Sequence, residues 1–258
     1  VRPMGMGGAF CGVANDVNAI YWNPAGLVNI SDKEFTVSYT SWFEGIEYAS
    51  LAYAQSLAER DALGASLIYL NAKDTERDEW GEDLISFTDM DIAFSFVYGY
   101  RLTNRVAVGG GLKYISQKLE KESATAFAFD AGALYALIEN LTLGLSAQNI
   151  GSKVKFVKEE DTLPTNIKLG VAYKINKDFT LALDFNEPND GDTYLCGGGE
   201  YWLKNFAFRL GYRTGPADEG GDLTMGLGFK VKRFQLDYVY VPYADLGDTH
   251  RVSLIMKF

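Results

Sequence analysis

From residue 34 to the last residue, large apolar side chains alternate with small or polar ones, in fourteen segments of about ten residues each. In 91–102, for example, Ile92 and Phe94 share one face, and Ala93 and Ser95 share the other. A two-residue period places successive side chains on opposite faces of a β-strand. The pattern therefore predicts an all-β chain of about 14 strands. The expected strands span 34–42, 48–57, 61–71, 91–102, 105–117, 125–137, 141–150, 165–175, 179–186, 193–203, 206–213, 223–231, 234–241 and 249–258.

The two faces of the expected strands differ in size and polarity. One face is large, apolar and aromatic, whereas the other carries many Gly, Ala and Ser residues and scattered charges. A soluble sandwich turns its apolar face inward and covers its outside with long polar side chains. Small side chains suit the crowded inside of a barrel whose bulky apolar face meets lipid, so we expect a transmembrane antiparallel β-barrel rather than a soluble all-β protein. The charged residues expected to line the lumen are Arg101, Lys113, Asp130, Lys168, Asp184, Arg209, Lys230, Asp237 and Arg251.

The connections between the expected strands alternate between short and long. Short connections include 58–60, 103–104 and 139–140, whereas 72–90 and 151–164 are long. Short periplasmic turns and longer outer loops are typical of outer-membrane barrels. With an even number of strands, this asymmetry predicts an outer-membrane protein with both termini on the periplasmic side.

The last expected strand ends in an aromatic residue, Phe258, and Val252, Leu254 and Met256 share its face. This strand resembles the C-terminal strand by which the barrel-assembly machinery recognises outer-membrane substrates. The resemblance implies that Phe258 is an assembly signal and that the assembly machinery is a partner.

The start of the chain lacks the two-residue period and is rich in small residues. Its glycines permit close packing, and its proline fixes a turn because it restricts its own φ and biases the preceding residue toward an extended conformation. We expect residues 1–31 to form a compact, partly helical hatch in the lumen of a barrel built by 32–258. The residues of the hatch motif are Gly5, Gly7, Gly8, Asn23, Pro24 and Ala25.

The glycine-rich start, the Asn23-Pro24-Ala25 motif and the fourteen expected strands together resemble the FadL-like superfamily of outer-membrane barrels, most closely its PorV/PorQ family. The resemblance implies passage or binding of hydrophobic or amphipathic small molecules across the outer membrane of a Gram-negative bacterium. A hatch would block the lumen and shift when ligand binds. Fatty-acid transporters of this superfamily have a kinked third strand that opens a lateral exit. Here Gly64, Leu67 and Ile68 of the third expected strand are candidates for such an opening or for a bulge.

The PorV branch also includes a component that shuttles cargo in protein secretion across the outer membrane. The chain lacks the long outer loops of the fatty-acid transporters, and its expected lumen carries charges of both signs. These features favour the alternative of a scaffold or shuttle that binds secretion-system proteins without transporting small molecules. Both hypotheses stay open at the level of sequence.

Several other functions are disfavoured. A formal net charge of −10 argues against binding to nucleic acid. No cluster of His and Cys residues supports a metal site, and nothing indicates a cofactor. A hydrolase triad or dyad usually needs a histidine, and the sole histidine, His250, falls in register with the lipid-facing residues. We therefore do not expect an enzyme.

Three acidic runs, at 74–79, 159–161 and 218–219, fall in the expected outer loops. They are either solvated loop residues or groups that bridge divalent cations bound to lipopolysaccharide. No leader with a charged start and a long apolar stretch precedes residue 1, so we take the chain as a mature or truncated form.

Overall fold

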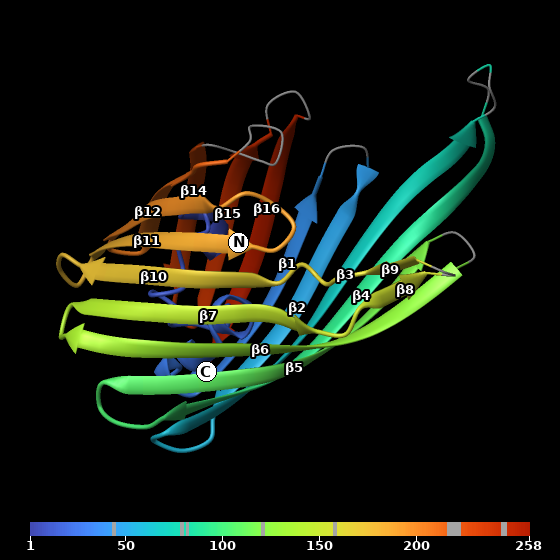
Figure 1. Cartoon of the computed structure of the whole chain (residues 1–258). Helices are drawn as coiled ribbons and strands as arrows, with labels where there is room; N and C mark the ends of the chain where they lie inside the picture. The colour runs from blue at the N-terminus through green and yellow to red at the C-terminus, as the bar shows by residue number, and fades with distance from the viewer. Residues whose placement is uncertain are drawn as a thin grey trace.

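The computed structural model describes residues 1–42, 45–77, 80, 83–119, 122–156, 159–215, 223–243 and 247–258. Fourteen strands of this described part form one closed antiparallel barrel, in which β1 closes the ring by pairing with β16 (Figure 1). The barrel strands are β1 (Lys33–Ser41), β2 (Glu47–Ser56), β3 (Asp61–Arg77), β4 (Asp83–Arg101), β5 (Val106–Leu119), β6 (Glu122–Ile138), β7 (Leu141–Gly151), β10 (Asn166–Lys174), β11 (Phe179–Pro188), β12 (Tyr194–Leu203), β13 (Phe206–Arg213), β14 (Leu223–Val231), β15 (Phe234–Pro242) and β16 (Asp248–Lys257).

The alternating pattern becomes an alternation between the outside and the inside of the barrel. On β4, Phe96 is 50% exposed, whereas its neighbours Ser95 and Val97 are 4% and 1% exposed. The outer wall is thus apolar and aromatic, and the polar residues of the strands are the buried ones. This is the inverse of a soluble protein and is the arrangement of a transmembrane barrel.

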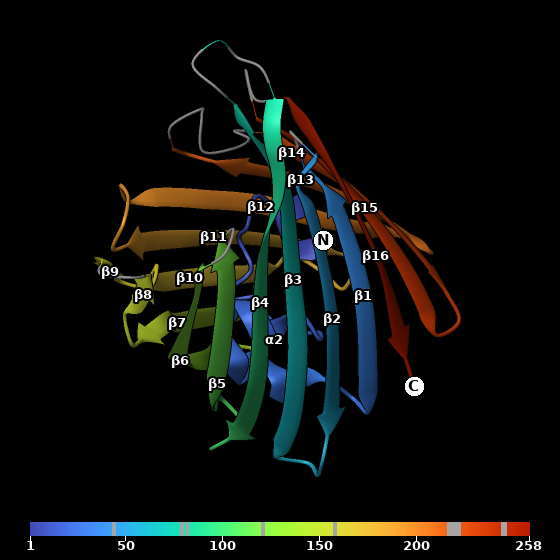
Figure 2. The same cartoon turned by 90° about the vertical axis from the view of Figure 1, so that its right-hand side faces the viewer.

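The predicted all-β barrel of about 14 strands is confirmed, and the ends of twelve expected strands agree with the structure to within three residues. The expected long loop at 72–90 is wrong, because β3 and β4 continue to Arg77 and from Asp83 and pair with each other there. This hairpin rises beyond the neighbouring strands (Figure 2). A second small hairpin, β8 (Val154–Phe156) with β9 (Glu159–Asp161), occupies part of the expected loop at 151–164.

The N-terminal segment lies inside the ring of strands, where Figure 1 shows it in dark blue. Its described helices are short: α1 (Arg2–Gly5), α2 (Ala19–Trp22) and the 3₁₀-helix η1 (Pro24–Asn29). Met6, Phe10 and Leu27 of this segment are completely buried. The apolar core of the molecule therefore lies between the segment and the inner wall, and we call residues 1–30 the hatch.

The inner wall carries glycines at many of the points where the hatch packs most closely against it. Nine strands each place one glycine toward the hatch, and a Cβ atom at any of these positions would come within 3.1 Å of a hatch atom. Cβ atoms essentially never approach other atoms below 3.0 Å, so most of these positions exclude every other residue. This glycine belt consists of Gly64, Gly99, Gly109, Gly132, Gly144, Gly170, Gly198, Gly211 and Gly226.

The glycine belt predicts a contrast between inward and outward glycines of the wall. In a Gly211→Ala variant the new Cβ would meet the backbone of Met6 and Gly7, so we expect hatch docking to weaken by about 1–3 kcal/mol. In Gly197→Ala, on the outer face, the nearest described atom is a Leu183 methyl at 4.0 Å, so docking should be unchanged. Proteolysis of the hatch over a urea series measures both; equal urea sensitivity of the two variants would contradict the role of the belt.

Candidate functional site

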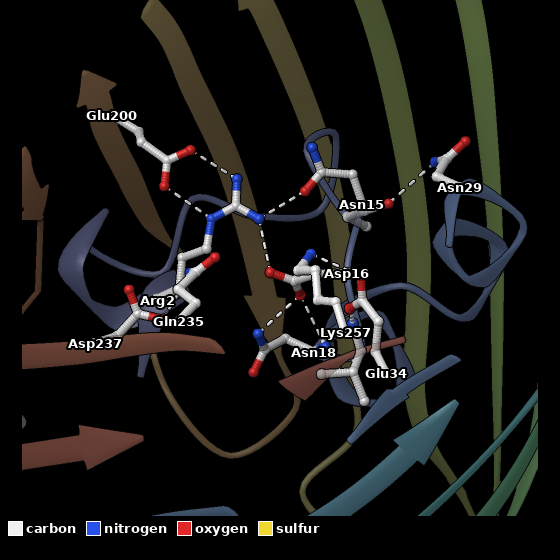
Figure 3. Close-up of polar contacts among 12 residues, drawn as sticks. Arg2, Asn15, Asp16, Asn18, Asn29, Glu34, Glu200, Gln235, Asp237 and Lys257 are labelled. Carbon is white, nitrogen blue, oxygen red and sulfur yellow. Dashed lines mark hydrogen bonds and ion pairs between the residues drawn. The ribbon is translucent and has the colours of Figure 1, made fainter. Parts of the chain in front are cut away.

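A network of buried charges fixes the hatch to the wall (Figure 3). Arg2 of the hatch donates to both carboxylate oxygens of Glu200 on β12, at 2.8 and 2.7 Å, and its Nη1 donates to Asp16 at 2.7 Å. Arg209 donates to Glu200 and to Asp237, each at 2.7 Å. All five side chains are at most 10% exposed, so their hydrogen bonds are strong and directional. We call this group the latch network.

A second polar contact joins the hatch to the seam where the first and last strands meet. Glu34 on β1 accepts a hydrogen bond from the Val17 amide at 2.9 Å and one from Lys257 on β16 at 2.6 Å (Figure 3). One carboxylate therefore binds the hatch, β1 and β16 together. Closure of the barrel and seating of the hatch share this residue.

Hatch backbone is also held by Asp184 on β11. Its Oδ2 accepts hydrogen bonds from the amides of Phe10 and Cys11, at 2.8 and 2.7 Å. Burial, together with the smaller effect of the nearby Asp184 carboxylate, raises the pKa of the Cys11 thiol to about 12. Cys11 is therefore a protonated, structural thiol at neutral pH.

The Asn23-Pro24-Ala25 motif forms the turn into η1 and packs on the glycine belt. Asn23 Nδ2 donates to the carbonyls of Cys11 and Ala133, at 2.9 and 3.2 Å, and its Oδ1 accepts from the Ala25 amide. Pro24 begins η1, where its missing amide proton has no structural cost. Asn23 thus joins both halves of the hatch to β6 of the wall.

A cavity of about 600 Å³ lies in the lumen above the hatch. Its floor is hatch surface that includes Met4, Ile20, Tyr21 and Trp22. The wall of β1–β3 gives it mainly small polar side chains, and β10–β13 and β16 give it longer ones. Residues of its rim, such as Trp42 and Asp190, lie at the strand ends that carry the longer loops. Its wall side chains include Ser38, Ser50, Lys168, Asn186, Arg213 and Arg251.

Cations of this cavity lie on aromatic rings. Lys168 Nζ is 4.4 Å from the ring centre of Trp22, and the guanidinium of Arg213 is 4.0 Å from that of Tyr194. The Arg251 guanidinium is 5.7 Å from the ring of Trp42. All six residues line the cavity, which therefore combines positive charge with flat apolar surfaces.

Eight of the nine residues expected to line the lumen fall into three groups. Lys168 and Arg251 line the cavity. Asp184, Arg209, Asp237 and Arg101 hold the hatch or lie against it, and Arg101 donates to the carbonyl of Val28 at 2.8 Å. Lys113 and Asp130 form a buried ion pair of 2.9 Å. Lys230 differs from the expectation: it is exposed at the end of β14, because the turn to β15 begins directly after Val231.

Residues of the hatch motif lie at close contacts. Gly7 and Gly8 have φ values of 65° and 86°, which favour glycine, and a Cβ on Gly5 would meet Val239 and Arg209. Sequence reasoning missed Arg2, Asp16, Glu34 and Glu200. Glu200 could have been predicted to face the lumen, since it continues the inward register of β12. Arg2 and Asp16 lie in the hatch, where no two-residue period indicates which side chains face the wall.

The expected lateral opening at Gly64, Leu67 and Ile68 is absent from the described strands. β3 pairs with β2 from Ala62 to Asn71 and with β4 from Asp61 onward, without a register shift before Glu76. Position 64 requires a small residue because Ile20 and Leu27 of the hatch pack against Gly64. Leu67 faces outward and Ile68 lines the cavity, so the two-sided apolar run serves both faces of an intact wall.

Phe258 lies next to the seam and is 51% exposed, and its amide donates to the carbonyl of Lys33 at 3.0 Å. No helix in the described part of the chain is long and apolar enough to cross a membrane. The described residues contain no group of three or more His, Cys, Asp or Glu side chains that could hold a metal ion. The acidic run 218–219 lies outside the described residues.

The closed barrel with a hatch in its lumen shares its fold with a FadL homologue and with hydrocarbon channels. Solved structures with this fold include the monoaromatic hydrocarbon channel CymD, with 13% identity, a TM-score of 0.77, and coverage of 99% of this chain and 96% of that chain. The toluene transporter TodX of P. putida is 14% identical with a TM-score of 0.72, and a FadL homologue of Pseudomonas aeruginosa is 12% identical with a TM-score of 0.70; each match covers 99% of this chain and 97% of the other.

A family model described as "Type IX secretion system protein PorV" matches residues 1–186. The chain belongs to this PorV family, and the predicted resemblance is confirmed. No curated protein sequence matches the chain.

The latch network predicts that hatch docking weakens in acid. Burial alone raises the pKa of the Asp16 carboxyl, but the Arg2 guanidinium outweighs it and holds the pKa below the ordinary 3.8. The stability from Asp16 is therefore complete above pH 3.8 and is lost as the pH falls through the lower folded-state pKa. We expect Asp16→Asn to weaken docking by about 2 kcal/mol at pH 7 and to lose less on acidification than the parent protein.

Urea midpoints of hatch release, followed by tryptophan emission at neutral and acid pH, measure this difference. Asp32→Asn, which changes an exposed carboxylate on the link to β1, is the matched control and should behave as the parent does. An unchanged pH response in Asp16→Asn would show that Asp16 does not carry the acid sensitivity.

Proposed function

We propose that this barrel binds a hydrophobic or amphipathic small molecule in the lumen cavity, with the hatch as a floor that must move for passage to follow. The proposal places the short turns and both termini on the periplasmic side, so that the cavity opens toward the cell exterior. The asymmetry between short and long connections supports this orientation.

The observation that carries the proposal is the cavity itself. Its volume of about 600 Å³ falls within the range of about 300–1,000 Å³ that is usual for small-molecule sites. Aromatic rings of Trp22, Trp42 and Tyr48 give it apolar surface, and Ser38, Ser50 and the cations give it polar groups. The solved structures of the same fold are named as hydrocarbon channels and a toluene transporter, which supports ligands of mixed or apolar character.

Passage is a separate step, because the hatch is closely packed. The glycine belt surrounds it and the latch network binds it to β12, so it cannot slide past the wall without breaking these contacts. Ligand in the cavity would lie against Tyr21 and Trp22 of the hatch. Binding is therefore the first step, and displacement of the hatch is the step that would open the lumen.

Ligand binding is testable with a cysteine placed in the cavity. In a Cys11→Ala, Cys196→Ala background, Ser50→Cys lines the cavity and Thr103→Cys lies exposed at a short turn. We expect the neutral probe 4-butylbenzyl alcohol to slow modification of Ser50→Cys by a small methanethiosulfonate reagent at least about fivefold, since an occupied cavity excludes the reagent. Modification of Thr103→Cys should not change. Equal rates with and without probe at Ser50→Cys would contradict binding.

Passage is testable by removing the hatch. Vesicles that contain a variant without residues 1–31 should take up the same probe much faster than vesicles with the full chain, because the hatch fills the lumen below the cavity. If the full chain alone raises uptake above empty vesicles, the hatch moves during function. If removal leaves uptake unchanged, the lumen is no conduit.

A second candidate function is a scaffold or shuttle in protein secretion, without small-molecule transport. The family match to a type IX secretion system protein favours it. The β3–β4 hairpin, which rises beyond the neighbouring strands β2 and β5, offers a surface for a partner protein (Figure 2). Mild crosslinking in cells followed by purification should recover secretion-system proteins; recovery of none would count against this function.

We further propose that the barrel is not an enzyme and that its other contacts are those of any outer-membrane barrel: lipid, lipopolysaccharide and, through Phe258, the assembly machinery. The named relatives are channels and a secretion component rather than enzymes. His250 bonds to the Tyr238 hydroxyl at 2.7 Å and stacks on its ring, which supports a structural role on the outer wall.

A further inference from the structure

We infer that the outer wall of the barrel binds an anionic phospholipid at one defined place. An acyl chain lies in a groove over β12, and Lys174, Lys177 and Lys204 on the adjacent short turns bind the phosphate. The inference goes beyond the proposed function, because it concerns the lipid-facing surface and not the lumen. It also goes beyond the general contact of a barrel with lipid, because it names one position and one headgroup charge. The proposed orientation of the barrel would make this lipid one of the periplasmic leaflet.

A groove with a volume of about 850 Å³ lies on the outer wall over β10–β14, and we call it the outer groove. Its base is β12, where Gly197 and Gly199 face outward and have no side chains. Its sides are outward apolar side chains of the two adjacent strands, Leu181 and Leu183 on β11 and Leu210 and Tyr212 on β13. These sides are two strand spacings, or about 10 Å, apart, which leaves room for one acyl chain between them.

Neither the hatch nor the strand pairing requires glycine at the base of the outer groove. Gly198 faces the lumen and packs against the hatch, whereas Gly197 and Gly199 face the other way. β12 pairs with both neighbouring strands from Cys196 to Tyr201 without a register shift, and neither outward glycine has a positive φ. Glycine inside a strand marks a bulge, a bend or a close approach of another group. The regular pairing leaves a close approach from the lipid side.

Gly110 on β5 provides a comparison elsewhere on the outer wall. It also faces outward, but a Cβ atom added there would lie 3.0 Å from the ring of Phe129, so this ring covers it. A Cβ atom on Gly197 would meet no described atom closer than a Leu183 methyl at 4.0 Å. The protein thus fills the gap over Gly110 with its own side chain and leaves the gap over β12 open to lipid.

Three lysines lie at the end of the outer groove that faces the short turns. The lining residues at this end include Tyr173 on β10 and Tyr201 on β12. Lys174 directly follows Tyr173, and Lys177 lies in the turn that comes next. Lys204 lies three residues beyond Tyr201, about 10 Å along the strand. All three lysines are exposed, and none of them forms an ion pair within 4.0 Å with a described residue.

The short turns at this end of the barrel divide into a basic half and a balanced half. In the basic half, the turns β10–β11, β12–β13 and β14–β15 carry Lys174, Lys177, Lys204, Lys230, Lys232 and Arg233, with Asp178 as their one carboxylate. In the balanced half, the turns β2–β3, β4–β5 and β6–β7 carry Arg60, Arg101, Arg105, Glu59, Asp61 and Glu139. Clusters of lysine and arginine at a membrane surface attract anionic headgroups. The outer groove ends at the basic half.

The depth of these groups in the membrane matches the parts of a phospholipid. Aromatic side chains lie between the groove and the lysines: Phe179 contacts Tyr201 at 6.0 Å between ring centres, and Phe206 contacts Phe229 at 4.9 Å. Aromatic girdles of outer-membrane barrels lie at the level where acyl chains meet headgroups. The outer groove therefore lies at the level of the acyl chains, and the lysines lie at the level of the phosphates.

Charge also distinguishes a lipid from a second copy of this chain as the occupant. Two copies that met at this face in one membrane would place the same basic turns against each other. Like charges at such a contact repel, whereas the phosphate of an anionic lipid complements them. The outer groove and the lysines together therefore fit a phospholipid with a net negative charge.

The test uses the full chain in phosphatidylcholine nanodiscs that contain a small fraction of a photoreactive lipid. Two probes have the same diazirine-bearing acyl chain, and one has a phosphatidylglycerol headgroup and the other a phosphatidylcholine headgroup. Mass spectrometry of peptides maps and counts the adducts after illumination. We expect the anionic probe to label the outer groove at least about fivefold more than the zwitterionic probe. The two probes should label the outer wall of β2–β5 equally.

Charge variants assign the headgroup preference to the lysines. A variant with Lys174→Gln, Lys177→Gln and Lys204→Gln should label the outer groove equally with both probes, because the cations that favour the anionic headgroup are gone. The matched control, Arg60→Gln with Arg105→Gln, removes two exposed cations from turns of the balanced half and should keep the preference of the parent.

Groove variants assign the position of the acyl chain. Gly197→Leu with Gly199→Leu fills the outer groove and should lower its labelling by both probes at least about fivefold. Ala65→Leu is the matched control, since Ala65 faces outward on β3 between Tyr53 and Phe96 and does not line the groove. The shift in electrophoretic mobility on heating shows which variants are folded.

The parent protein alone decides the inference if a variant fails to fold. Equal labelling of the outer groove by the two probes would show that the headgroup requirement is wrong. Labelling of the groove no stronger than that of the outer wall of β2–β5, or stable dimers in sedimentation that exclude both probes from the groove, would show that no lipid site exists there. Each of these results leaves the proposed function of the lumen cavity intact, since the cavity is tested by its own probe.

Discussion

The structure depends on the absence of side chains along a belt of the inner wall. In a barrel of fourteen strands, inward side chains of ordinary size would leave too little room for a further segment in the lumen. Glycines on nine strands allow the hatch backbone to lie directly against the wall. Because an added Cβ at Gly211 or Gly132 would overlap hatch atoms, the wall and the hatch must have matching shapes. The belt therefore explains both why the lumen is closed below the cavity and why the cavity has a fixed floor.

Charge gives the hatch its orientation, since close packing alone has little direction. Arg2 and Glu200 meet in a two-pronged pair, and Glu34 binds the hatch at the seam of β1 and β16. In a dry lumen these bonds are strong when complete and costly when one partner is missing. A transmembrane barrel can hold such groups only inside, because its outer surface meets lipid. The polar side chains of the inner wall are thus the groups that fix the orientation of the hatch.

The sequence predicted the barrel far better than it predicted the site. Strand positions follow from a local two-residue period. Because one face of each strand meets lipid, large apolar residues alternate clearly with small or polar ones. A strand such as the one in Asp91–Leu102 can therefore be predicted from its own residues alone. The β3–β4 extension was missed because most residues of 72–83 are polar or charged, so the sequence has no alternation of large apolar side chains there. Contacts of the hatch join residues that are far apart in the sequence, such as Arg2 and Glu200, and no sequence pattern indicates which residues meet. Gly64 was a candidate for a wall opening or a bulge, because a glycine is compatible with a gap as well as with a closely packed neighbour. The position of Ile20, which packs on Gly64, decides between these possibilities.

The same two constraints separate the charges of the lumen by role. Where the hatch touches the wall, cations and carboxylates meet within hydrogen-bond distance, as Arg209 does with Glu200 and Asp237. Above the hatch the packing ends, and there the described cations lie on aromatic rings, with one carboxylate at the rim. Lys168 lies at this boundary, because it lines the cavity and its Nζ is 4.4 Å from the ring centre of Trp22 on the hatch. The contact between Lys168 and Trp22 therefore joins the wall of the cavity to the hatch that forms its floor.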